Sequence, residues 1–151
     1  MSAALLEVEG LETAYGSSMS FWRPARAERA RHEAAAAVAE RVGLGDRLDR
    51  IAGALSHGEQ RQLEVGLALA LDPKLLLLDE PMAGMGPDES ERMVALLQGL
   101  RGSVTMLLVE HDMDAVFRLA DRISTLVAGR VIASGTPAEI RGHAEIGRAH
   151  V

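Results

Sequence analysis

The sequence lacks cysteine and long apolar runs, and each absence excludes a class of protein. With no Cys among 151 residues, disulfides, zinc–thiolate sites and iron–sulfur clusters are excluded. No apolar run reaches the roughly 18 residues that a membrane-spanning helix needs, and the start of the sequence lacks the pattern of a signal peptide. The net charge of −6 argues against a dedicated nucleic-acid-binding protein. The default compartment is therefore the cytoplasm.

The composition that remains is that of a globular domain. Hydrophobic residues make up 48% and charged residues 25%, and the length suits one domain of about 150 residues. Apolar runs that end in polar turns predict strands at Leu5–Gly10, Leu75–Leu78 and Val104–Val109. The last two are expected to be buried on both faces, as in a parallel sheet. Two shorter strands are expected at Ile123–Val127 and Val131–Ser134, joined around Gly129.

Helices are predicted between these strands from composition and capping signals. An Ala-, Arg- and Glu-rich segment predicts a helix over 25–42. Ser-x-x-Glu at Ser56 and Thr-x-x-Glu at Thr136 are capping boxes that open two more helices, and Pro87 opens another at its first position. A further helix is expected to end near Ala120. The apolar face of the helix after Ser56 is expected at Leu63, Leu67, Ala70 and Leu71. The alternation of strands and helices predicts an α/β fold with a mostly parallel sheet and flanking helices.

Two carboxylates follow the strand at Leu75–Leu78. Asp79 and Glu80 lie where ligands bind in open α/β sheets. Asp79 can hold Mg²⁺ through its water shell, and Glu80 can orient or deprotonate a water that attacks a phosphate. The alternative is a core strand that runs into a polar turn.

Two other segments carry groups suited to phosphate. Ser56 and Gly58 at a helix start supply a hydroxyl, free backbone N–H groups and the positive end of the helix dipole. An ordinary helix cap is the favoured interpretation of Ser-x-x-Glu taken alone. His111, at the end of the strand Val104–Val109, is a second candidate phosphate contact, and a structural hydrogen bond is its alternative.

The order and spacing of these segments resemble the ATP-binding subunits of ABC transporters. Leu55–Gln60 resembles the signature motif, Leu75–Glu80 the Walker B strand with its catalytic glutamate, and Met82–Pro87 the D-loop. His111 resembles the switch histidine. The resemblance is continuous over residues 40–141 and is strongest to importers of branched-chain amino acids and their urea-type relatives. Leu5–Gly16 separately resembles the first strand of these subunits.

The resemblance implies roles and partners. Glu80 and His111 would be catalytic, Asp79 would bind Mg²⁺, and Ser56, Gly58 and Gln60 would contact ATP across a head-to-tail dimer with a second ATPase subunit. Tyr15 would stack on adenine, although a Tyr after a strand is usually a packed surface residue. The resemblance implies that the chain lies at the cytoplasmic face of the plasma membrane. There it would bind transmembrane permease subunits and not nucleic acid.

The sequence departs from the family at the phosphate-binding loop. No G-x-x-x-x-G-K-[ST] occurs in the chain, and its one lysine, Lys74, follows no Gly-rich loop. Gly86 stands where many members have the D-loop Asp. We interpret a break in composition at residues 17–21 as a junction, where the Walker A strand and loop of a partial P-loop NTPase-like fold are missing. This divides the chain into an amino-terminal strand remnant (1–18), a helical subdomain remnant (19–54), a core with signature, Walker B and switch histidine (55–141), and a tail (142–151).

Three functions remain open at this point. The first is an importer ATPase subunit in an incomplete copy that hydrolyses ATP poorly or not at all alone. The second is a non-enzymatic partner that supplies its signature motif to a complete subunit. A DNA-repair or chromosome-type ATPase is disfavoured, because the chain has neither heptads nor cysteines. The tail from Glu145 resembles a reading frame of a sequencing adapter, with a natural polar tail as the alternative, and we expect it to carry no function.

Overall fold

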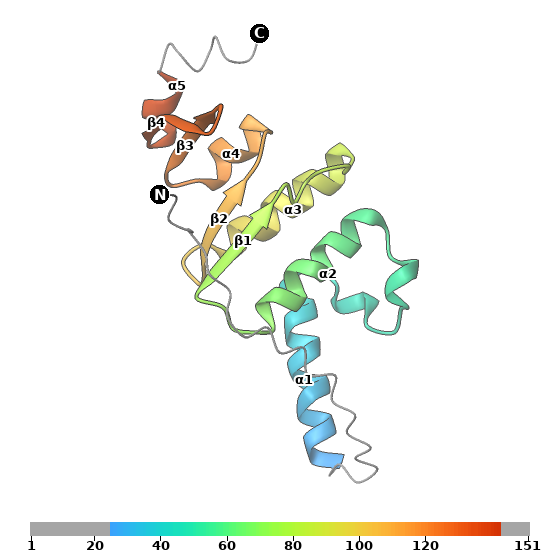
Figure 1. The fold of residues 1–151 in the computed structure, drawn as a ribbon. Helices are drawn as coiled ribbons and strands as arrows, with labels where there is room; N and C mark the ends of the chain where they lie inside the picture. The colour runs from blue at the N-terminus through green and yellow to red at the C-terminus, as the bar shows by residue number, and fades with distance from the viewer. Residues whose placement is uncertain (1–24, 143–151) are drawn as a thin grey trace.

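The computed structural model describes residues 25–142, which form helices packed against a short parallel strand pair, followed by a hairpin and a final short helix (Figure 1). The predicted strand at Leu5–Gly10 and Tyr15 lie outside the described residues. The order of elements is that predicted from the sequence. In chain order they are α1 (Ala25–Arg41), the 3-10 turns η1 (Gly45–Arg47) and η2 (Ala52–Ala54), α2 (His57–Leu69), β1 (Leu75–Asp79), α3 (Pro87–Leu100), β2 (Thr105–Val109), α4 (Met113–Leu119), β3 (Ile123–Val127), β4 (Arg130–Gly135) and α5 (Pro137–Arg141).

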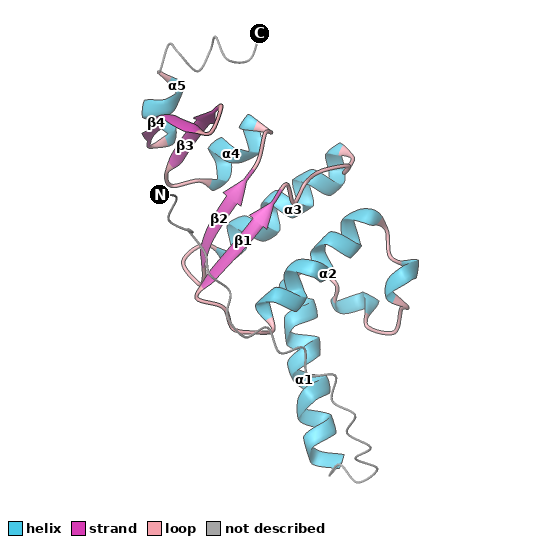
Figure 2. Cartoon of the chain, in the orientation of Figure 1, coloured by secondary structure: helices cyan, strands magenta, loops and turns pink. Residues whose placement is uncertain are grey.

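The strands form two separate pairs (Figure 2). β1 and β2 are parallel, with Leu75 opposite Thr105 and Asp79 opposite Val109, and α3 makes the crossover that a parallel pair requires. β3 and β4 form an antiparallel hairpin. Across residues 25–142, β2 pairs with β1 alone, so its other edge carries no strand. Both predicted catalytic residues follow the ends of the parallel pair.

The main core lies between α1, α2, α3 and one face of the parallel pair. Its most buried side chains are Val42, Met93 and Leu97. α1 approaches α2 closely at Gly66, where an added Cβ would lie 3.2 Å from Cγ2 of Val42. A smaller cluster joins Ile123 of the hairpin to Ile140 of α5.

The predicted apolar face of α2 is wrong at Leu67, Ala70 and Leu71, whereas Leu63 does pack against the main core. Leu67 is 63% exposed and Leu71, just beyond the helix, is 82% exposed. The face that packs carries Val65, Gly66 and Leu69. The two leucines fit a helical period, but the close approach of α1 at Gly66 determines which side of α2 is covered.

The expectation that both strands are buried on both faces is also wrong. Leu76 is buried, whereas Leu75, Leu77, Leu107 and Val109 are each more than half exposed. Side chains alternate along a strand, and those that pack into the core share one face, where α2 and α3 supply its other members. Over the part that the structure describes, no helix is both long and apolar enough to cross a membrane.

Candidate functional site

Asp79 and Glu80 lie at the carboxyl end of β1, as predicted. Asp79 is the last residue of the strand. Glu80 extends the pairing by one bond, because its N–H donates to the carbonyl oxygen of Val109 at 2.9 Å. It then turns the chain with a φ of 45°, a left-handed conformation that is uncommon outside glycine and clusters at functional sites. The backbone therefore bends sharply at the predicted catalytic carboxylate.

Glu80 and His111 are brought together by the strand register. Each follows a strand end, and Asp79 pairs with Val109. Nδ1 of His111 lies 3.6 Å from Oε1 of Glu80, and both side chains are more than half exposed. A carboxylate and an imidazole therefore meet at one open edge of the sheet, 31 residues apart in the sequence.

Ser56 forms the predicted helix cap. Its hydroxyl accepts from the Glu59 N–H at 3.2 Å, and the Glu59 carboxylate accepts from the Ser56 N–H at 2.9 Å. Arg47 also donates to Glu59, at 2.8 Å. The hydrogen bond from the Ser56 backbone, followed by that from Arg47, lowers the pKa of Glu59. The start of α2 is thus fixed by a complete capping box.

A carboxylate already occupies the donors that were predicted to bind phosphate. Oε1 of Glu89, on α3, accepts from the Gly58 N–H and from the Ser56 hydroxyl, each at 3.1 Å. These bonds, with that from Gly58 the larger influence, lower the pKa of Glu89. A Cβ at Gly58 would lie 2.8 Å from the same oxygen. The geometry of these donors therefore suits an oxyanion.

The other signature residues make one local contact and one long-range contact. The Gln60 amide donates to the Leu55 carbonyl at 3.2 Å, so it holds the turn before α2. Nε2 of His57 lies 3.3 Å from the carbonyl oxygen of Ala83. The start of α2 therefore lies beside the turn that follows Glu80.

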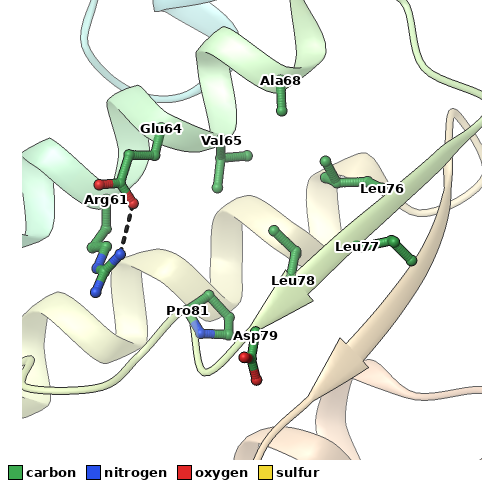
Figure 3. Close-up of a pocket in the computed structure, with 9 residues that line it drawn as sticks. All are labelled: Arg61, Glu64, Val65, Ala68, Leu76, Leu77, Leu78, Asp79 and Pro81. Atoms are coloured by element: carbon green, nitrogen blue, oxygen red, sulfur yellow. Dashed lines mark hydrogen bonds and ion pairs between the residues drawn. The ribbon is translucent and has the colours of Figure 1, made fainter. Parts of the chain in front are cut away.

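A shallow pocket of about 210 Å³ lies between α2 and β1, with Asp79 in its lining (Figure 3). Among the side chains described, those of residues 29–142, no three His, Asp or Glu are grouped to hold a metal ion. Asp79 is exposed, and Mg²⁺, which keeps several waters, is commonly held by one or two carboxylates together with substrate phosphates. Asp79 therefore fits a water-mediated role toward Mg²⁺.

One residue of the site had no role in the predictions. The Glu110 side chain is only 1% exposed, and it accepts hydrogen bonds from the backbone of Met82 and His111 at 3.2 and 3.1 Å. In the sequence, Glu110 stands between an apolar strand and a histidine, and nothing there distinguishes it from the first exposed residue of a polar turn. Its burial depends on contacts with a distant segment.

Comparisons with known proteins identify the family of the chain. The model of the ABC transporter family matches residues 6–83. The chain belongs to this family. It is 40% identical over 128 residues to the high-affinity branched-chain amino acid transport ATP-binding protein BraF of Pseudomonas aeruginosa, a match that covers 83% of this chain and 50% of BraF. It is 38% identical to LivG of Escherichia coli, with the same coverage.

Solved structures confirm the fold. The ATP-binding cassette MJ1267 is 30% identical, with a TM-score of 0.73 over 86% of this chain and 53% of that one. Part of the cbiONQ transporter complex, cbiO1 of Clostridium perfringens, is 27% identical with a TM-score of 0.70, over 85% of this chain and 51% of cbiO1. This ABC chain spans about half the length of the relatives it matches. The expected partial ATP-binding-cassette fold is confirmed.

Proposed function

We propose that the chain is an incomplete copy of the ATP-binding subunit of an importer for branched-chain amino acids or related small solutes. The main support is the 3.6 Å approach of His111 to Glu80, in a chain about 40% identical to branched-chain amino acid transport proteins. A complete subunit would couple ATP hydrolysis to a transmembrane permease at the cytoplasmic face of the membrane. Without a G-x-x-x-x-G-K-[ST] segment, this chain hydrolyses ATP poorly or not at all alone.

The proposed roles of the residues follow from their positions. Glu80, exposed at the strand end, would orient or deprotonate the attacking water, and His111 beside it would contact the transferred phosphate. Asp79 would hold Mg²⁺ through water, and the ion would neutralise charge on the phosphates. Ser56 and Gly58 would donate to the phosphate of ATP bound to a second subunit, in a head-to-tail dimer, in place of the Glu89 carboxylate that they bind here. Tyr15, outside the described residues, would stack on adenine.

The test is Mg²⁺-dependent ATP hydrolysis by the purified chain. We expect turnover no higher than that of Glu80→Gln. Asp88→Asn, which makes the same change of charge at an exposed residue in the first turn of α3, is the matched control. Turnover that is lost in Glu80→Gln and kept in Asp88→Asn would contradict the proposed incompleteness.

A second function is supported by the intact cap at Ser56. Ser56 is an exposed residue and its capping box is complete, so the chain could present its signature motif to a complete subunit. Under this alternative the chain binds a full-length subunit such as E. coli LivG and stimulates its ATPase activity, and Ser56→Ala abolishes the stimulation.

Thr136→Ala is the control for that experiment, because it removes an equivalent capping box from α5. Stimulation lost in both variants would point to general destabilisation. Failure of the wild-type chain to bind any full-length subunit would reject the alternative and leave the first proposal in place.

A further inference from the structure

Glu110 is a buried carboxylate shared between two loops. Oε1 accepts from the N–H of Met82 at 3.2 Å, in the turn after β1. Oε2 accepts from the N–H of His111 at 3.1 Å and, more weakly, from that of Asp112 at 3.5 Å, after β2. The side chain is 1% exposed. One carboxylate thus uses a separate oxygen for each of the two segments that carry Glu80 and His111.

The surroundings of this carboxylate supply few positive charges. Within residues 29–142 no Lys or Arg forms an ion pair with Glu110, and His111 Nδ1 lies 3.9 Å from it. Backbone N–H groups therefore provide most of its stabilisation. A buried carboxylate is retained in a fold only when such partners compensate it. If either loop moved away, one oxygen of Glu110 would lose its hydrogen-bond donor or become exposed to water.

We infer that Glu110 is a positioning residue, which ties the turn after β1 to the loop after β2 and thereby sets the 3.6 Å approach of His111 to Glu80. The catalytic importance of this placement rests on the proposed function, in which Glu80 would act on the attacking water and His111 would contact the phosphate. The placement itself depends only on the contacts of Glu110.

Two substitutions separate the features that Glu110 combines. Glu110→Gln keeps the length of the side chain but leaves one acceptor oxygen, and its NH₂ group would face a backbone donor. Glu110→Asp keeps the charge and both oxygens, but is one methylene too short to reach both loops. Glu91→Gln is the control, because Glu91 makes an exposed ion pair with Arg118, between α3 and α4, and forms no hydrogen bond with either loop.

The first measurement is amide hydrogen exchange by NMR. We expect exchange at Met82 or His111 to be about tenfold faster in Glu110→Gln and in Glu110→Asp, as for the loss of one buried hydrogen bond. Exchange at the α2 amides should not change. Glu91→Gln should leave Met82 and His111 as in the wild type.

The second measurement reports positioning and not stability. In the wild type, Glu80→Gln should shift the imidazole resonances of His111, because the two side chains are in contact. In the Glu110→Asp background this shift should be lost. Folded Glu110 variants with unchanged exchange and an unchanged Glu80–His111 response would overturn the inference.

If the Glu110 variants do not fold, the inference is tested by a measurement on the wild-type protein alone. Scalar couplings across the hydrogen bonds from the Met82 and His111 amides to the Glu110 carboxyl carbon should both be detectable, and absence of both would overturn the inference. None of these measurements uses nucleotide. Failure of the ATPase experiments would therefore reject the proposed function without affecting the positioning of His111 by Glu110.

Discussion

The corrected face of α2 gives a sharp prediction, because the helix carries a buried and an exposed leucine two residues apart. Leu69 is 5% exposed and lies in the main core, whereas Leu67 is 63% exposed. The periodicity of the sequence assigned Leu67 to the core. Leu69→Ala and Leu67→Ala are therefore the same chemical change on opposite faces of one helix.

The expected costs differ severalfold. Truncating a core leucine to alanine loses transfer free energy and leaves a cavity, at a cost of 2–5 kcal/mol in general. We expect about 3 kcal/mol for Leu69→Ala, roughly a hundredfold in the folding equilibrium. Leu67→Ala should change the free energy of unfolding by less than about 0.5 kcal/mol, because most of its side chain is already in water and alanine favours a helix slightly more.

The assay is urea unfolding followed by far-ultraviolet circular dichroism. If Leu69→Ala is unfolded in buffer, Leu69→Met, a nearly volume-conserving change that usually costs less than about 1.5 kcal/mol, is compared with Leu67→Met. Equal losses at the two positions, or a larger loss at Leu67, would refute the packing of α2 against α1 and α3 described here.

Two further predictions concern the caps. Ser56→Ala should lower the free energy of unfolding by about 1 kcal/mol and Ser56→Asn should recover most of it, because Asn also caps helices well; both are read from urea midpoints. The second prediction is a loss of stability in acid. The native pKa values of Glu59, Glu89 and Glu139 are all lowered, mainly by backbone hydrogen bonds. Their stabilisation is therefore complete above the ordinary glutamate pKa of about 4.3 and is lost as the pH falls through the lower native values. The urea midpoint should be flat from about pH 7 to pH 5, fall below about pH 4, and fall less in Glu139→Gln.

Local signals predicted the element boundaries well. The two capping boxes place the starts of α2 and α5 to the residue, because a cap is decided by side chains within three residues of the helix start. Pro87 marks the start of α3 for a similar reason. Such signals depend on neighbours in the sequence, and the rest of the fold does not alter them.

Burial was predicted less well, because it depends on what covers a face. The run of leucines in β1 is apolar on both sides, yet Leu76 is buried while Leu77 is 62% exposed. Nothing in four consecutive leucines distinguishes a face packed on helices from an open one. The leucines of α2 present the same ambiguity, which the contact between Gly66 and Val42 resolves.

The residues of the candidate site show the same contrast: some could be proposed from the sequence, and one became evident only from the fold. Asp79, Glu80 and His111 could be proposed from sequence because parallel strands place their carboxyl ends together, and the register brings Glu80 and His111 to 3.6 Å. Glu110 precedes His111 directly, but its partner Met82 lies 28 residues earlier. Only the folded turn reveals that this acid faces inward onto backbone donors while its neighbour His111 faces solvent. In the sequence, a glutamate in an exposed polar turn cannot be told from a glutamate that holds two loops together. The 1% exposure of the Glu110 side chain in the structure shows that it is the second kind.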